Sequence, residues 1–375
     1  MTMTAERPGD VAAPRRGRAL TVITLTVALG AAAFLLLGTP GTKTPAPPPA
    51  RTDAATAWPS AARADLPAGL PDGPLFNPTL FLDATTAVGT APTPAGSEQR
   101  LLLRTGDELR ELRRVPLDGN PQFEAFTVAG DQIFWTESTA GSTSVRIWTA
   151  NRSGGTARML TADTGNAVFY GNQYDLVVAE DRVHWTAAPA SGRGTEETEI
   201  RSVPVTGGPV RVKVETGQWS LSAWPWLVDD GSSSGTPRLR NMSTARDREI
   251  VSPGAQQLTC GPVWCRAMVL GDNTVARIDV VRPDGTDRRR VAGGAAQSAV
   301  TDVAILDRFE ILAEQTADSD LTGTSALVVY DIATGRTVDV SAKADGAFSR
   351  GGMLWWSTST ADDEITWHSL DLRTV

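Results

Sequence analysis

The chain has 375 residues, with 35 basic and 43 acidic side chains, a formal net charge of −8, and only two histidines and two cysteines. This length suffices for one large all-β domain or for two to three average domains with a sizeable core. The acidic balance excludes a general nucleic-acid-binding protein, because binding to the phosphate backbone needs a net basic surface.

An uncharged apolar segment near the N-terminus predicts a membrane anchor. Residues 20–37 contain ten Leu, Ile, Val or Phe side chains, and a helix of eighteen residues spans about 27 Å, close to the thickness of the hydrocarbon core. Arg15, Arg16 and Arg18 precede it, so the positive-inside rule places a tail at 1–18 in the cytoplasm and a transmembrane helix at 19–38. The alternative is a cleaved signal peptide, although its apolar region is usually shorter.

Residues 39–74 are rich in proline and predict an extended linker, because proline fixes φ and lacks an amide hydrogen. The rest of the chain would then lie outside the cytoplasm. Only three of the 35 basic residues are lysines, which we interpret as the codon bias of a GC-rich bacterial genome. The expected location is therefore a bacterial cell membrane, with one span and an extracytoplasmic domain.

Four later stretches each combine an alternating strand, a glycine-containing turn and a second alternating strand. They are residues 145–160, 198–214, 276–291 and 326–340. Glycine in such turns supplies the positive φ that tight hairpins need. The three consecutive arginines Arg288, Arg289 and Arg290 then fall on the second strand of a hairpin, and we interpret them as charges of an outer strand.

A series of large apolar residues recurs at intervals of 38 to 53 residues and indicates a repeat built from strands. We expect these residues to pack between neighbouring blades: Leu82, Trp135, Trp185, Trp226, Trp264, Ile311 and Trp355. Repeats of roughly 40–50 residues containing only strands are typical of a β-propeller. The predicted fold class is therefore all-β, a β-propeller over 75–375 with seven blades, or alternatively six. A segment near 58–80 would supply the missing outer strand of the last blade.

The pattern of Asp, an apolar position and Trp, followed by a strand, a glycine turn and another strand, occurs at DQIFWTE (131–137) and DRVHWTA (181–187). It resembles the TolB-like and WD40-like propeller repeats of bacterial envelope proteins, over about residues 75–375. This resemblance implies a binding scaffold and carries over no particular binding residue.

The two cysteines, Cys260 and Cys265, flank a Gly-Pro turn, which predicts that they face each other on adjacent strands and form a disulfide. The alternative is a pair of buried free thiols. A metal site would need further ligands, and no histidine lies near them in the sequence.

Other residues that could carry chemistry form no complete set. His184 lies on an expected inner strand, where it could contact a ligand in the central channel. Gly231–Gly235 matches G-x-S-x-G but lies in a polar loop, not in the strand-to-helix turn that a nucleophilic serine requires. Acidic loop pairs such as Asp229-Asp230 would suit Ca²⁺ only with further ligands. We identify no catalytic residue, no metal site and no cofactor, with Ca²⁺ as the one candidate.

The predicted function is a noncatalytic scaffold that binds an envelope protein or a cell-wall component through one propeller face, while residues 19–38 lie in the membrane. The alternative is a metal-dependent hydrolase or lyase that uses carboxylates and His184 near the central channel.

Overall fold

The computed structural model describes residues 51–375, apart from positions 143, 190–196, 232–236, 255, 272–273, 361 and 363. The predicted cytoplasmic tail, the transmembrane helix and residues 39–50 of the linker lie outside this part. Between residue 51 and the C-terminus, no described helix has the length and apolar character needed to cross a membrane.

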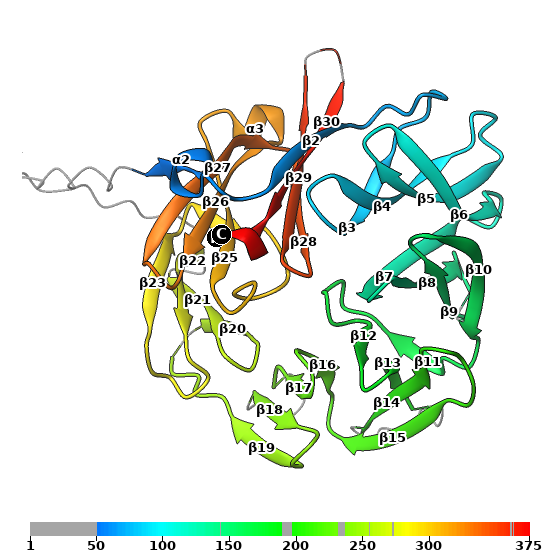
Figure 1. The fold of residues 1–375 in the computed structure, drawn as a ribbon. Coiled ribbons are helices and arrows are strands. Elements are labelled where there is room, and N and C mark those ends of the chain that lie inside the picture. Colours follow the sequence, from blue (N-terminus) through cyan, green and yellow to red (C-terminus); the bar gives the residue numbers. More distant parts are fainter. Residues whose placement is uncertain are drawn as a thin grey trace, which may run out of the picture. The chain divides into compact units, whose positions relative to one another are not determined.

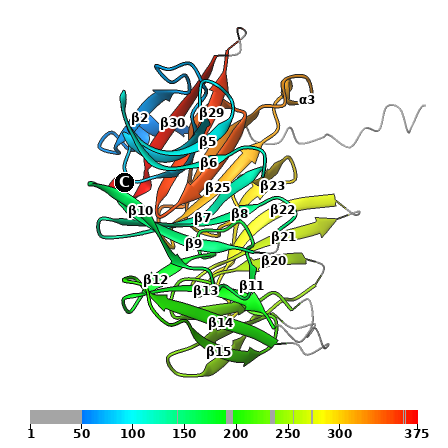
Figure 2. The same ribbon diagram turned by 90° about the vertical axis from the view of Figure 1, so that its right-hand side faces the viewer.

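The described strands form seven sheets arranged around one axis, as Figure 1 shows. The fold is thus a seven-bladed, all-β propeller, and the alternative of six blades is excluded. Figure 2 shows the same ring from the side. Within each blade the chain runs outward from the axis through antiparallel strands, so the first strand of a blade lies nearest the centre.

The first four blades occupy residues 77–249. Blade one contains β3 (Asn77–Phe81), β4 (Thr86–Pro92), β5 (Glu98–Thr105) and β6 (Glu108–Pro116). Blade two contains β7 (Pro121–Ala129), β8 (Gln132–Thr139), β9 (Arg146–Asn151) and β10 (Gly154–Thr161). Blade three contains β11 (Asn166–Val168), β12 (Val177–Ala179), β13 (Arg182–Ala188), β14 (Glu197–Pro204) and β15 (Arg211–Thr216). Blade four contains β16 (Ser220–Leu221), β17 (Trp226–Asp229), β18 (Arg238–Asn241) and β19 (Arg246–Glu249).

The last three blades include two strands from the beginning of the described chain. Blade five contains β20 (Gln256–Cys260), β21 (Cys265–Gly271), β22 (Thr274–Val281) and β23 (Arg289–Gly293). Blade six contains β24 (Ala296–Ser298), β25 (Phe309–Glu314), β26 (Ser325–Asp331), β27 (Arg336–Ala344) and the short β1 (Thr52–Asp53). Blade seven contains β28 (Gly346–Arg350), β29 (Met353–Ser359), β30 (Ile365–Asp371) and β2 (Arg63–Pro67). The short helices are α2 (Ala54–Ala57), α3 (Ser319–Thr322) and the 3-10 turn η1 (Leu372–Thr374).

The ring closes through β2, which pairs antiparallel with β30 as the outermost strand of blade seven. This confirms the expected closing strand from residues 58–80. The propeller also begins earlier in the chain than predicted. Residues 51–74 were assigned to the linker, whereas β1 and β2 belong to blades six and seven. Leu66 of β2 is buried in the core between blades seven and one.

The second strand of a blade is apolar on both faces because a neighbouring blade covers each face. In β8, Ile133 and Trp135 pack toward blade one, while Phe134 packs against residues of blade three. Side chains of successive strand residues point to opposite faces, so one short apolar run serves two interfaces. The described residues form seven such apolar clusters, one for each junction of the ring.

The predicted series of apolar residues lies at more than one structural position. Trp135, Trp185, Ile311 and Trp355 lie on second strands and are buried. Trp264 is also buried, but it lies in the turn before β21.

Two members of the series depart further from the expectation. Leu82 follows β3, the innermost strand of its blade, and is only partly buried; the second strand β4 instead buries Val88. Trp226 is likewise only partly buried, and its neighbour Leu227 takes the fully buried position. The repeat interval therefore did not select the fully buried residue in blades one and four, because the strands of these blades begin at different offsets within the repeat.

Arg289 and Arg290 lie on β23 as expected, with Arg288 just before the strand, and the turn before them contains Gly285 at φ 83°. Its positive φ favours glycine, and a Cβ atom there would also lie only 3.0 Å from Val251 Cγ1, a tight contact. Arg288 forms an ion pair with Asp279 (2.9 Å), so this charge is neutralised within its own blade.

Candidate functional site

Residues 169–176, here called the axial loop, interrupt the innermost strand of blade three between β11 and β12. Both strands pair with β13, so the loop projects from one edge of the sheet. The Asp175 carboxylate accepts hydrogen bonds from the backbone N–H groups of Tyr170 and Gly171, each at 2.8 Å. Burial raises the pKa of Asp175, although these two bonds oppose the shift. The loop is therefore closed by its own buried carboxylate.

Contacts with blades six and seven fix the axial loop on the side opposite to blade three. Thr301 Oγ1 donates to the carbonyl oxygen of Gly171 (3.1 Å). The N–H of Gln173 donates to Asp302 Oδ1 (3.4 Å), and the N–H of Gly351 donates to Gln173 Oε1 (3.1 Å). Since these blades lie across a seven-membered ring from blade three, the loop reaches over the axis.

Arg350, the last residue of β28, links three blades at the axis. Its guanidinium donates to the carbonyl oxygens of Phe126 (2.5 Å) in blade two and Asn172 (3.2 Å) in the axial loop. Burial lowers the pKa of Arg350, and the negative charges of Asp302 and Asp175 partly oppose this effect. An arginine stays protonated under such conditions, so Arg350 is a fixed positive charge at the centre of the molecule.

Asp302 is the most perturbed carboxylate of the site. Its side chain is 6% exposed, and burial raises its pKa to about 6, although Gln173, Arg350 and Arg266 favour the charged form. Arg266 fixes the backbone of Asp302 by donating to its carbonyl oxygen (2.5 Å). Arg266 is itself held by a buried ion pair with Glu310. The carboxylate is therefore positioned by the fold and incompletely compensated.

An acidic cavity of about 290 Å³ lies between blades three, four, five and six. Its lining includes the side chains of Asp229, Asp230, Asp302 and Asp307 together with Tyr170, Tyr174 and Trp264. Among the described residues, the lining contains no Lys, Arg or His. We call it the acidic cavity.

A second cavity of about 440 Å³ is formed by blades one, two, three and seven. Its lining contains Arg152, Arg350 and Arg373 and, within the described part of the chain, no carboxylate. Tyr174 of the axial loop contributes to both cavities, so the loop forms a common wall. The two sides of this wall therefore differ in the sign of the charges that face the cavities.

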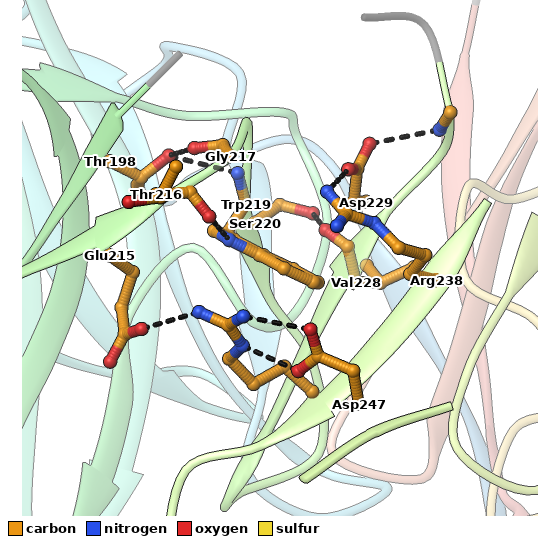
Figure 3. A network of polar contacts seen from close by, with 12 residues as sticks. Thr198, Glu215, Thr216, Gly217, Trp219, Ser220, Val228, Asp229, Arg238 and Asp247 are labelled. Carbon is orange, nitrogen blue, oxygen red and sulfur yellow. Dashed lines mark hydrogen bonds and ion pairs between the residues drawn. The ribbon is translucent and has the colours of Figure 1, made fainter. Parts of the chain in front are cut away.

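Figure 3 shows the polar network that fixes the blade-four side of the acidic cavity. Asp229 accepts a hydrogen bond from Arg238 Nη2 (2.7 Å), so its charge is paired. Arg240 bridges blades three and four by donating to Glu215 and Asp247, both at 2.6 Å. The two arginines lie over the ring of the buried Trp219, with 5.0 and 4.8 Å to its centroid. Ion pairs therefore connect this junction, and the charge of Asp229 is paired with that of Arg238.

The disulfide Cys260–Cys265 is present, as predicted. It joins the last residue of β20 to the first residue of β21, which face each other in the pairing of these strands. Residues 260–262 also line the acidic cavity. The bond therefore braces the part of blade five that borders this cavity.

His184 lies on β13 and lines neither cavity. Its Nε2 is 3.2 Å from the carbonyl oxygen of Ala179, its ring is 4.0 Å from that of Trp224, and burial lowers its pKa. This places the side chain between blades three and four, not at the axis.

Of the GSSSG motif only Gly231 is described. Among the described residues, no three or more His, Cys, Asp or Glu side chains are grouped so that they could hold a metal ion.

The sequence reasoning missed the axial loop, Asp302 and Arg350. One signal was available, because the interval from Trp135 to Trp185 is 50 residues, longer than the two that follow. The extra length is the axial loop. No local motif identifies Asp302 or Arg350, since they reach the loop only through closure of the ring.

No protein-family model matches the sequence, and a comparison with curated proteins finds no match. Solved structures resemble it with low identity. The β-propeller domain of the Trilobed protease from Pyrococcus furiosus has 10% identity and a TM-score of 0.49, covering 76% of this chain and 89% of that one. An uncharacterized protein from Listeria monocytogenes EGD-e has 11% and 0.48, covering 75% and 88%. An oligogalacturonate lyase from Vibrio parahaemolyticus has 7% and 0.48, covering 83% and 97%. Similarity at this level carries no activity, substrate or partner over to this protein.

Proposed function

We propose that this protein is a membrane-anchored, extracytoplasmic propeller that binds a protein or cell-wall component of the bacterial envelope, without catalysing a reaction. The observation that supports this most is the acidic cavity, which is formed by side chains from several blades and braced by the axial loop and the disulfide. Preformed cavities with a few converging polar groups are the usual form of binding sites.

The membrane location is proposed from the sequence alone, through the apolar segment 19–38 and the arginines before it. The proposed kinship with TolB-like and WD40-like repeats also rests on sequence pattern. It agrees with a binding role because such propellers present loops of variable length on a fixed ring.

The location can be tested by fractionating cells that express the full chain or a chain lacking residues 19–38. We expect the full chain in the membrane fraction. After the outer layers of the envelope have been opened and the inner membrane left intact, added protease should degrade its propeller. A full chain that is recovered in the soluble fraction, or that stays protected until the inner membrane is lysed, would contradict the proposal.

The binding role can be tested by chemical crosslinking in cells followed by mass spectrometry. The full chain is compared with a control chain that lacks residues 51–375, which removes the whole propeller. The proposal predicts a captured envelope component that is absent from the control and crosslinked through residues near the acidic cavity. Identical recoveries from the two chains would refute it.

A second candidate is a metal-dependent hydrolase or lyase that acts at the axis, and one observation favours it. A carboxyl group with a pKa near 6 is suited to general acid–base catalysis close to neutral pH, and Asp302 has that property. The enzyme alternative predicted from the sequence also used His184, which lines neither cavity in the structure. The two functions are distinguished by assaying purified protein for stoichiometric Ca²⁺ and for turnover of envelope saccharides or lactones with and without chelator.

A further inference from the structure

Asp302 is an acidic side chain without an ion-pair partner in the described part of the chain, although it is more than nine-tenths buried. Its hydrogen bond from the N–H of Gln173 is long, at 3.4 Å. Asp229 and Glu310, which are also buried near the acidic cavity, form ion pairs with Arg238 and Arg266, and Asp175 accepts two short backbone hydrogen bonds. A buried carboxylate without an ion pair is costly even when, as here, Gln173, Arg350 and Arg266 partly stabilise its charge, and Asp302 lines the acidic cavity.

Charge around the cavity reinforces that of Asp302. Asp230 and Asp307 are exposed and also line it, and no described lining residue is basic. Asp302 and Asp307 both act electrostatically on Tyr174, and Asp230 acts on Tyr170, so each tyrosine has a carboxylate nearby. The charges on the cavity lining itself thus favour cations over anions, while Arg266, Arg350 and Arg282 beyond the lining partly offset them.

The aromatic side chains of the cavity complement a cation of one particular kind. Tyr170 and Tyr174 come from the axial loop, and Tyr170 is 53% exposed. Aromatic faces next to carboxylates are the usual environment for ammonium and guanidinium groups. The ring quadrupole attracts the cation, and the ring surface also contacts the alkyl part of the ligand. A bare divalent ion would instead need several oxygen ligands in one shell, and the described carboxylates form no such group.

We propose that the acidic cavity binds an organic cation, an ammonium or guanidinium group, with Asp302 as its buried counter-ion and the axial-loop tyrosines against its sides. A volume of about 290 Å³ lies at the small end of ligand pockets, so the occupant is a single cationic group with its alkyl stem. Its source is either a free amine or a Lys or Arg side chain of a bound polypeptide. The inference rests on the proposed binding function and specifies its chemistry.

The test is calorimetric titration of the full-length protein at pH 7.5 with four probes. The probes are putrescine, a doubly blocked lysine (acetyl and methylamide ends), its uncharged counterpart norleucine with the same ends, and CaCl₂. We expect both amines to bind and norleucine to bind at least tenfold more weakly than blocked lysine. Equal binding of lysine and norleucine, or binding of Ca²⁺ with neither amine, would overturn the proposal. Tighter binding of blocked lysine supports a polypeptide source, and tighter binding of putrescine supports a free amine.

Variants locate the binding. Asp302→Asn keeps the shape and the acceptor for Gln173, and we expect it to weaken amine binding at least tenfold. Asp118→Asn is the matched control, because Asp118 is exposed and lines neither cavity, and it should change the affinity less than twofold. Tyr170→Leu should weaken binding about threefold or more, while Tyr170→Phe, which retains the aromatic face, should not. Equal effects of Asp302→Asn and Asp118→Asn would refute the assignment even if an amine binds.

Failure of this inference is distinguishable from failure of the proposed function. If crosslinking in cells captures an envelope component near the acidic cavity but no amine binds, the cation proposal is wrong and the binding function stands. If amines bind as expected but nothing is captured in cells, the cation site stands and the role as an envelope scaffold is wrong.

Discussion

Replacing Asp302 by asparagine should stabilise the unliganded protein, and the gain should depend on pH. In the folded protein the pKa of Asp302 is about 6, against an ordinary value of 3.8. Above pH 6 the carboxylate is charged in both states, so folding bears the full cost of burying it. As the pH falls through 6, the folded carboxyl takes up a proton, and the cost declines toward zero below 3.8.

The size of this cost follows from the difference between the two pKa values. One pKa unit corresponds to about 1.36 kcal/mol, so the cost is about 3 kcal/mol at pH 8 and about 1 kcal/mol at pH 4.5. The asparagine side chain carries no charge at either pH. Asp302→Asn is therefore expected to raise the free energy of unfolding by about 3 kcal/mol at pH 8 and by about 1 kcal/mol at pH 4.5.

The measurement is urea unfolding followed by tryptophan fluorescence, for the wild type, Asp302→Asn and Asp118→Asn, at both pH values. The difference between the two pH values isolates Asp302, because all other groups titrate alike in the three proteins. A gain that is the same at pH 8 and pH 4.5, or a loss at pH 8, would show that Asp302 is not a poorly compensated buried charge.

Three further variants test the framework around the site. Leu66→Ala should cost about 2–5 kcal/mol and increase hydrogen exchange in β30, because Leu66 anchors the closing strand; unchanged exchange in β30 would argue against that role. Glu310→Ala should cost about 3–5 kcal/mol by leaving Arg266 buried without its partner, whereas an effect below about 1 kcal/mol in urea unfolding would contradict a buried pair. Replacing both Cys260 and Cys265 by alanine should cost about 2 kcal/mol, as expected for a very short loop, and should make the melting temperature insensitive to reductant. Reductant sensitivity that persists in that double variant would rule out this disulfide as its source.

The repeat could be predicted from the sequence because each blade is specified locally. Glycine turns recur in four of the blades and the large apolar residue recurs at a regular interval, so the all-β class, the seven blades and the disulfide hairpin were predictable. Spacing alone did not select the most buried residue at Leu82, which follows the first strand of its blade, or at Trp226, which lies on the second strand next to the fully buried Leu227. The start of the propeller was also placed too late, since β1 and β2 pair with strands 286 to 307 residues further along the chain.

The candidate site was not predictable in the same way. Asp302 acquires its properties from burial against the axial loop, and Arg350 acquires its position from blades two, three and seven together. These contacts join residues 129 to 224 positions apart, which no local pattern encodes. His184 illustrates the converse, because its strand was predicted correctly while its side chain turned out to pack between two blades.

The proposed binding of an envelope component in the acidic cavity can be tested by photocrosslinking in living cells. A photoreactive amino acid replaces Tyr170, at the cavity, or Leu321 of α3, which is 88% exposed and lines neither cavity. The account predicts one specific adduct from position 170 that is absent from position 321, is lost when Asp302→Asn is added, and is retained with Asp118→Asn. An adduct that forms equally from both positions would contradict the binding role of the cavity. An adduct from position 170 alone that survives Asp302→Asn unchanged would leave the binding role standing and contradict the assignment of Asp302 as counter-ion.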